Sequence, residues 1–377
     1  MRMGFGFGVD TSGTPFSPLA FFAANEQGIW LDPSDFSTLF QDAAGTTPVT
    51  ALGQPVGLAL DKRLGLALGA ELVTNGGFDS DTAWIDSNTG TGTAVISGGV
   101  LTLTGTDTSN RGRSYQALTV ESGKMYRVTL TKTGAAASVW VGTSPGGSGV
   151  AAVDAASPSF IFLATAATVY LMFLTTSAGG TVNFDNISVR ELPGNHAYQT
   201  TLAARQTAQS NYLSLDKTDD HLLVSAGGAG TTGFLLVAGI MVPAAGTART
   251  LWSDRGTNTG YKVGIDASNQ IFLSAGNGAA FVTATGPALV AGTKYVITAW
   301  HDGANLNISV NNGAPTQAAF VTATAGTATF TIGKANASAT EYWGDRIYGM
   351  VYRKNDTSAA GQRSSLYSYM VGKMGGL

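Results

Sequence analysis

The chain of 377 residues contains no cysteine and only three histidines. Without a thiol it can form no disulfide framework, no thiolate metal site and no cysteine nucleophile. Charged residues make up 12% of the chain, about half of the share that is usual in globular proteins. The 21 basic residues are scattered and the formal net charge is −3, so we expect no nucleic-acid partner.

Long apolar runs are also missing. No segment reaches the ~18 consecutive apolar residues that a membrane-spanning helix needs, so we expect no membrane insertion. The most apolar stretch, residues 160–174, is interrupted by Thr165 and Thr168 and predicts buried strands. Residues 1–8 contain no continuous apolar segment, and we therefore expect no secretory signal peptide.

The chain is rich in glycine, with 50 residues, and many of its segments show the two-residue periodicity of β-strands. Apolar and polar residues alternate between 125 and 133, which is the pattern of a half-buried strand. Similar segments, separated by Gly- and Ser-rich turns, recur over residues 93–190 and 212–353 at the spacing of β-sandwiches. Only the tail changes period, because apolar residues recur three and four positions apart between 366 and 371 and predict a C-terminal helix.

The order of these segments predicts that one β-domain is inserted into another. Residues 28–62 read like the opening of a lectin-like sandwich whose continuation begins only at Gly194. We therefore expect an all-β protein of two β-sandwich (jelly-roll) domains. The outer sandwich would consist of residues 28–70 and 194–377, and the inserted one of residues 71–193.

Residues 1–27 are predicted to form an N-terminal extended docking arm. Aromatic residues on a Gly- and Pro-rich backbone cannot build a core of their own. We expect Phe5, Phe7, Phe21 and Phe22 to make assembly contacts, either on another subunit or back on the body of the chain. A disordered terminus is the alternative.

The inserted stretch opens with residues 72–79 (LVTNGGFD) and Trp84, and it closes with residues 182–190 (VNFDNISVR). In these two motifs it resembles the jelly-roll carbohydrate-binding modules that flank many glycanases. The resemblance implies that Asp79 and Asp185 hold a structural Ca²⁺, an ion that prefers hard oxygen ligands. Surface carboxylates of turns are the alternative.

The outer stretch carries residues 30–49 (WLDPSDFSTLFQDAAGTTPV) before the insertion, and residues 216–222 and 294–313 after it. In these segments it resembles the concanavalin-like and laminin-G-like sandwich domains of tailed-bacteriophage virion proteins. Where such domains have a Gly after the first Asp of the 216–222 turn, this chain has Lys217. The resemblance implies a virion protein that is made in the host cytoplasm, is released by lysis and assembles with other virion proteins as a homotrimer.

We expect no catalytic residue and no certain cofactor. Sandwich glycanases place carboxylates two residues apart on one strand. None of the five glutamates has an acidic neighbour at that spacing, and Glu341 with Asp345 lacks the middle carboxylate. Ser144 stands in a Gly-x-Ser-x-Gly pattern, but residues 147–149 (GSG) cannot open the helix that such a nucleophile needs.

The sequence favours sugar binding over catalysis, because flat aromatic side chains can stack on the apolar faces of sugar rings. The candidates in the insert are Trp84, Tyr115, Trp140 and Tyr170, for which a place in the core is the alternative. The candidates in the outer domain are Trp252, Asp254, Arg255, Tyr261 and Trp343, for which packing on a neighbouring subunit is the alternative.

Three functions follow from these expectations. The first is a structural and adhesive protein of a phage tail fibre or baseplate, which binds host surface polysaccharide by multivalent display. The second is a capsid decoration protein. The third is a polysaccharide depolymerase, which the spacing of the carboxylates disfavours.

Overall fold

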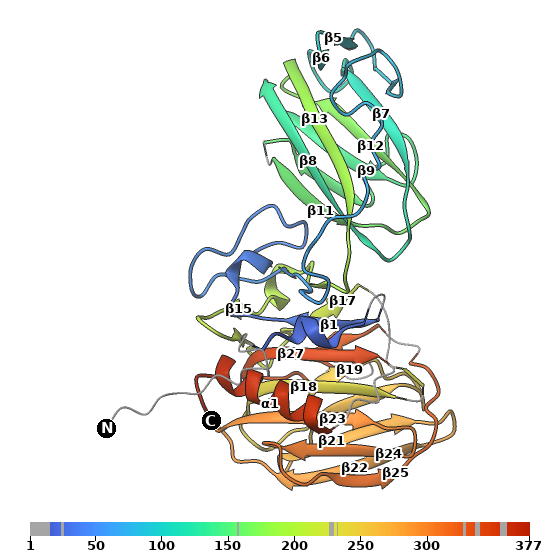
Figure 1. Ribbon diagram of the computed structural model, residues 1–377. Coiled ribbons are helices and arrows are strands. Elements are labelled where there is room, and N and C mark those ends of the chain that lie inside the picture. The colour runs from blue at the N-terminus through green and yellow to red at the C-terminus, as the bar shows by residue number, and fades with distance from the viewer. Residues whose placement is uncertain are drawn as a thin grey trace. The chain divides into compact units, whose positions relative to one another are not determined.

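The computed structural model describes residues 16–23, 26–156, 158–225, 230–231, 233–326, 329–335, 340–354 and 360–377. These residues form an all-β protein with one α-helix, α1 (Ala360–Lys373), near the C-terminus (Figure 1). The predicted fold class is confirmed. No described helix is both long and apolar enough to cross a membrane.

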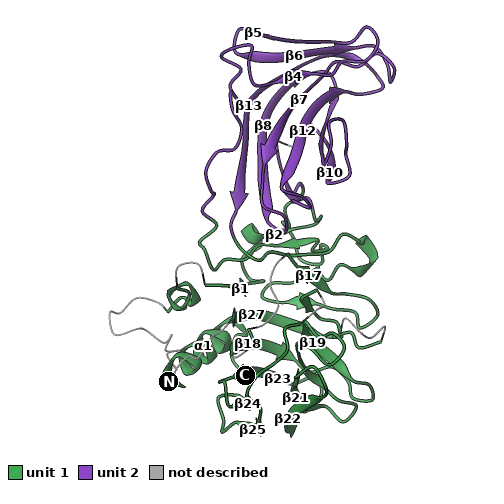
Figure 2. Cartoon of the chain, turned by 90° about the vertical axis from the view of Figure 1, so that its right-hand side faces the viewer, with its two compact units in different colours: residues 1–43, 47–66, 194–377 green, residues 44–46, 67–193 purple. Residues whose placement is uncertain are grey.

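The chain divides into two compact units, each of which is a β-sandwich (Figure 2). Unit 1 comprises residues 1–43, 47–66 and 194–377, and unit 2 comprises residues 44–46 and 67–193. The main segment of unit 2 begins at residue 67 where the sequence suggested 71, and its last residue is 193 in both cases.

Unit 1 consists of two antiparallel sheets that enclose one core. The first sheet contains β15 (Thr207–Ala208), β16 (Leu213–Ser214), β27 (Arg346–Lys354), β18 (Phe234–Met241), β23 (Lys294–His301), β24 (Asn305–Val310) and β25 (Thr316–Ala319), with β1 (Gly28–Leu31) paired to β27. The second sheet contains β2 (Leu39–Phe40), β3 (Leu58–Ala59), β14 (Ala197–Tyr198), β17 (Leu222–Val224), β26 (Thr331–Ile332), β19 (Arg249–Ser253), β20 (Tyr261–Ile265), β21 (Gln270–Gly276) and β22 (Phe281–Ala288).

The helix covers the outer face of the first sheet. Leu366 and Met370 of α1 are buried in an apolar cluster with Leu235 and Val237 of β18. Strand β18 is therefore apolar on both faces, because one face meets the core and the other meets the helix. Gly239 lets the helix lie close, since a Cβ at this position would stand 2.8 Å from the sulfur of Met374.

Segments from both sides of the insertion pair with one another inside unit 1. Strand β1 pairs with β27, so that Gly28 lies opposite Arg353. Strand β3 pairs with β14, so that Ala59 lies opposite Ala197. The early part of the chain thus belongs to the same sandwich as the residues that follow 194.

Unit 2 consists of two five-stranded antiparallel sheets around a separate core. The first sheet contains β10 (Ala151–Asp154), β9 (Ala137–Gly142), β12 (Thr168–Thr175), β7 (Arg113–Thr119) and β4 (Ile85–Asp86), in this order. The second contains β11 (Ser159–Leu163), β8 (Met125–Gly134), β13 (Gly180–Leu192), β6 (Val100–Gly105) and β5 (Thr93–Ser97).

The N-terminal arm turns back on its own chain where the structure describes it. A short 3₁₀ helix, η1 (Pro18–Phe21), precedes β1. Phe21 and Phe22 pack against the same apolar cluster that holds α1, and the ring of Phe21 lies 5.0 Å from that of Phe16. These two residues therefore contact the body of the chain, as one of the two alternatives predicted, while Phe5 and Phe7 lie outside the described residues.

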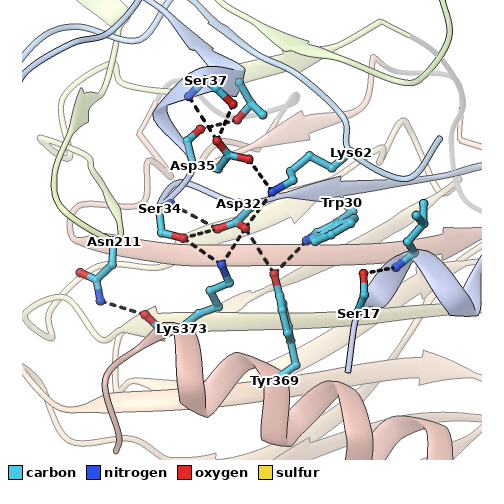
Figure 3. A network of polar contacts seen from close by, with 12 residues as sticks. Ser17, Trp30, Asp32, Ser34, Asp35, Ser37, Lys62, Asn211, Tyr369 and Lys373 are labelled. Atoms are coloured by element: carbon cyan, nitrogen blue, oxygen red, sulfur yellow. Dashed lines mark hydrogen bonds and ion pairs between the residues drawn. The ribbon is translucent and has the colours of Figure 1, made fainter. Parts of the chain in front are cut away.

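A buried carboxylate ties the start of unit 1 to its end (Figure 3). Asp32 accepts hydrogen bonds from Lys373 Nζ at 2.7 Å, Lys62 Nζ at 3.1 Å and Ser34 Oγ at 2.6 Å. Lys62 Nζ also lies 2.6 Å from Asp35 Oδ2. Burial alone would raise the pKa of Asp32, but the hydrogen bonds and charges of Lys373, Ser34 and Lys62 outweigh it and hold this pKa below its ordinary value.

We expect this network to make unit 1 sensitive to acid. A carboxylate whose folded-state pKa is lowered stabilises the fold fully above its unfolded pKa of about 4, and this contribution is lost as the pH falls through the folded value. The urea midpoint of the wild type should therefore fall from pH 7 to pH 3 by more than that of Asp32→Asn. An equal fall in both proteins would contradict a stabilising role of this carboxylate.

Candidate functional site

The outer-unit aromatic candidates lie in the core of unit 1. Trp252 and Trp343 are 0% exposed, and Tyr261 is 1% exposed. Trp252 packs among other rings, with centroids 5.3 Å from Phe234 and 5.4 Å from Tyr352. The prediction that these three side chains bind a glycan is wrong, because a ring without exposed surface cannot stack on a sugar.

The polar candidates of unit 1 support the same core. Asp254 is 0% exposed, and its Oδ1 accepts a hydrogen bond from the backbone N–H of Tyr261 at 2.6 Å. The guanidinium of Arg255 lies 3.4 Å from the ring centroid of Phe281. A glycan-binding role is therefore wrong for the buried Asp254, and Arg255 is left without the aromatic neighbours with which it was predicted to act.

Trp84 belongs to the core of unit 2. Its ring lies 5.3 Å from Phe78 and 5.5 Å from Phe173, and its Nε1 donates a hydrogen bond to the backbone oxygen of Asn75 at 3.0 Å. The predicted role of Trp84 in sugar binding is wrong, and its structural alternative is correct.

Tyr115 and Trp140, by contrast, lie half-buried on the outer face of one sheet of unit 2. Their neighbours along the strand, such as Val139 and Val141, are fully buried in the core. Because successive side chains of a strand point to opposite faces, Trp140 points away from that core. The same alternation puts Tyr115 on the outer face, since Ser114 and Gln116 point inward.

The register of the strands joins these two aromatic residues into one row. Ala152 pairs with Trp140, Trp140 with Met172, Met172 with Tyr115, and Tyr115 with Ile85. The row crosses all five strands of the sheet, from β10 to β4. We call this row, together with Tyr170, the aromatic face.

Tyr170 extends the aromatic face along the sheet. It stands on β12 two residues before Met172, and its ring centroid lies 5.9 Å from that of Tyr115 in an edge-on arrangement. Tyr115, Trp140 and Tyr170 are all half-buried, so each keeps part of its ring accessible while the backbone fixes its base. Rings held in this way lose little conformational entropy on binding.

Two arginines border the aromatic face. Arg113 stands on β7 two residues before Tyr115, and its Nη2 lies 3.3 Å from the sulfur of Met172. Arg111 precedes the strand, and its guanidinium carbon lies 6.0 Å from the ring centroid of Trp140, two strands away. Burial and the charge of Arg111 lower the pKa of the Arg113 guanidinium from its ordinary value.

Sequence reasoning did not single out Arg111, Arg113 and Met172 as site residues. The period of two offered a signal, because Arg111, Arg113 and Tyr115 stand at alternate positions and must share a face. Met172 carried no such signal. Only the pairing of β12 with both β7 and β9 places it between Tyr115 and Trp140.

The predicted calcium ligands lie at the surface of unit 2. Both carboxylate oxygens of Asp185 accept hydrogen bonds from Asn186, one from its backbone and one from its side chain. Neither Asp79 nor Asp185 belongs to a group of three or more potential metal-binding side chains in the described part of the chain. Two carboxylates fall short of the six to eight oxygens that Ca²⁺ takes. Calcium at this place stays a prediction, and nothing below depends on it.

One group of three carboxylates does exist among the described residues, in the turn that contains Asp216, Asp219 and Asp220. Burial raises the pKa of Asp220 to about 6, and the charges of Asp216 and Asp219 add to this effect. The oxygen Oδ2 of Asp220 accepts a hydrogen bond from the backbone N–H of Asp216 at 2.9 Å, so this residue already supports the turn.

The two sequence features that resembled catalytic groups are held by structural contacts. Glu341 accepts hydrogen bonds from Lys262 Nζ at 2.7 Å and from the hydroxyl of Thr250 at 2.9 Å. Although burial alone would raise it, the pKa of Glu341 is lowered by Lys262 and Thr250. Ser144 lies in the turn between β9 and β10 and is not followed by a helix.

Comparisons with known proteins give partial likenesses of fold. No protein-family profile matches the chain, and no curated protein matches it. One solved structure that is similar in part is the carbohydrate-binding module of the Ruminococcus gnavus IT-sialidase bound to α2,6-sialyllactose. It has 13% sequence identity and a TM-score of 0.31, and the match covers 37% of this chain and 84% of that chain.

Two further structures match to a similar extent. The SAP-like pentraxin of Limulus polyphemus has 14% identity, a coverage of 42% of this chain and 77% of that chain, and a TM-score of 0.32. Domain 4 of an extracellular arabinanase of Geobacillus stearothermophilus, in complex with arabinotriose, has 12% identity, coverages of 41% and 76%, and a TM-score of 0.34. Likenesses at this level carry no argument about function, which has to come from the side chains.

Proposed function

We propose that unit 2 is a glycan-binding module, and that the protein is a non-catalytic structural and adhesive component of a tailed-phage virion, on the tail fibre or baseplate. The observation that carries the proposal is the aromatic face, in which Trp140, Met172 and Tyr115 form one row across three neighbouring strands. An enzyme is disfavoured because Glu341 is ion-paired and Ser144 lies in a turn.

The geometry of the row suits a sugar ring. Trp140 and Tyr115 stand two strands apart, which corresponds to about 10 Å, and Met172 lies between them. A ring can rest its apolar C–H face on the exposed parts of Trp140 and Tyr115, because aromatic groups are polarizable and weakly hydrated, whereas Met172 is only 1% exposed and offers the sugar no contact. The hydroxyl groups of the sugar would then meet the polar border of the face.

The role in a virion is supported by the sequence of unit 1, above all by residues 30–49. We propose a homotrimer that assembles with other virion proteins and displays several copies of unit 2. A single shallow site binds weakly, but several linked sites on one particle gain avidity from their effective concentration.

Purified protein should compete with phage particles for the host surface. We expect it to reduce the adsorption of the phage that encodes it several-fold at saturating concentration, whereas the Trp140→Ala variant should not compete. Unchanged adsorption at saturating wild-type protein would contradict receptor binding.

Two further measurements test the other parts of the proposal. Immuno-gold labelling should place the protein on the tail, and label on the head would instead favour a capsid decoration protein. Incubation of the protein with host polysaccharide should release no reducing ends, and their release would overturn the non-catalytic assignment.

A further inference from the structure

Two arginines beside the aromatic face carry positive charge that no acidic side chain of the described residues balances. Arg111 and Arg113 stand two residues apart on the same face of an extended segment, which corresponds to about 7 Å. No ion pair joins either guanidinium to a carboxylate within the ranges that the structure describes. Two like charges therefore lie side by side without a counter-charge of the protein.

The hydrogen-bonding capacity of both arginines is largely unused. A guanidinium carries five N–H donors. The Nε–H groups of Arg111 and Arg113 are buried, and neither has a partner among the described residues. The structure records one hydrogen bond from the Arg113 guanidinium, to the sulfur of Met172, which is a weak acceptor.

Both arginines are held over the aromatic face by their surroundings. The turn between β9 and β10 lies against Arg113, because a Cβ at Gly146 would stand 2.8 Å from Nη2 of Arg113. Arg111, two residues before β7 begins, places its guanidinium carbon 6.0 Å from the ring centroid of Trp140 on β9. The two cations thus lie against Met172 and Trp140, next to the rings on which a sugar would rest.

From this juxtaposition we infer that unit 2 selects an acidic glycan, whose sugar carries a carboxylate that Arg111 and Arg113 bind while its ring lies on Trp140 and Tyr115. The inference rests on the proposed glycan-binding function and names its ligand class. A carboxylate is planar and accepts two parallel hydrogen bonds from one guanidinium, which makes such pairs directional as well as strong. It would also neutralise the repulsion between the two arginines.

The test compares acidic oligosaccharides with their own methyl esters, which keep the sugar and lose the charge. We would titrate the full chain with trigalacturonic acid, a hyaluronan tetrasaccharide and sialyllactose, each as the acid and as the methyl ester, by isothermal titration calorimetry. We expect at least one acid to bind and its ester to bind 10-fold more weakly or worse. A 6-sulfated galactoside serves as an anionic ligand without a carboxylate.

The variants report on the arginines themselves. The double variant Arg111→Gln, Arg113→Gln should bind acid and ester alike, with the affinity that the wild type shows for the ester. The double variant Arg111→Lys, Arg113→Lys keeps the positive charge but loses the planar set of guanidinium N–H donors, so it should lose part of the preference for the acid over its methyl ester. Arg127→Gln is the matched control, because Arg127 is exposed on β8 in the other sheet of unit 2. Circular dichroism checks that each variant is folded.

The outcomes separate the inference from the function on which it rests. If acid and ester bind equally and the glutamine variants change neither, while Trp140→Ala abolishes both, glycan binding stands and the acidic ligand class is overturned. If the sulfated sugar alone binds, the carboxylate is overturned. If no sugar of the panel binds at millimolar concentration, the inference fails, and the proposed function fails with it when the purified protein also leaves phage adsorption unchanged.

Discussion

Replacement of Trp140 by alanine should abolish glycan binding by unit 2. Trp140 is the largest side chain of the aromatic face; it stands opposite Met172 in the strand register, and the guanidinium carbon of Arg111 lies 6.0 Å from its ring centroid. Aromatic residues at the centre of a binding surface cost about 2 kcal/mol or more when they are truncated, which corresponds to at least ~30-fold in affinity. Calorimetry with the oligosaccharide panel measures this loss for acidic and neutral sugars alike.

A conservative substitution at Trp140 and a control substitution far from the aromatic face make this prediction more specific. Trp140→Phe keeps an aromatic ring of smaller area and should retain part of the affinity. Val95→Ala removes an exposed apolar side chain from the other sheet of unit 2 and should leave binding unchanged. The aromatic face would be refuted as the binding site if Trp140→Ala bound the same sugars with wild-type affinity.

The contrast between Trp140 and Trp84 shows how far the sequence could predict the site. The alternating strand around Trp140 was predictable, but alternation defines two faces without saying which of them meets the core. The structure puts Val139 and Val141 inside, so that Trp140 points outward. Trp84 follows the opening motif of the insert and was a candidate for sugar binding with the core as its alternative, and two phenylalanine rings lie against it.

The error at Trp252 and Trp343 has a different cause. Both stand near glycine and charged residues, which is the usual composition of a loop at the rim of a sandwich. Trp252 lies on β19, a central strand of its sheet, and packs on rings that are distant in the sequence, such as Phe234 and Phe330. The aromatic character of this core arises from long-range strand pairing, which a local pattern in one sequence does not contain.

The closure of unit 1 around its insertion follows the order of the chain more closely. The sequence predicted that residues before the insertion pair with residues after it, and the pairing of β3 with β14 agrees with this order. The polar contacts that hold the two segments of unit 1 together were not predicted. They converge on Asp61, which is fully buried and stands just before unit 2 begins.

Replacement of Asp61 by asparagine should strongly destabilise unit 1. The carboxylate accepts hydrogen bonds from the backbone N–H groups of Trp30 and Asn195, each at 2.8 Å, and it forms a buried ion pair with Arg63 at 2.9 Å. It thus links three segments, one of which lies beyond the inserted unit. An asparagine has one oxygen instead of two, so its NH₂ group would face some of the N–H donors that the carboxylate now accepts from. It would also leave the charge of Arg63 without a counter-charge.

Breaking a buried ion pair from one side costs about 3–5 kcal/mol, and we expect a loss of this size in the free energy of unfolding of unit 1. Amide hydrogen exchange of the full chain can assign the loss to its unit. Peptides that cover β1, β3 and β14 should exchange faster in Asp61→Asn, while peptides from β8 and β13 of unit 2 should keep their wild-type rates. Asp216→Asn, which changes an exposed carboxylate of unit 1, should stay within about 0.5 kcal/mol of the wild type. Equal acceleration in both units would mean that Asp61 stabilises the chain as a whole, and not the closure of the outer sandwich around its insertion.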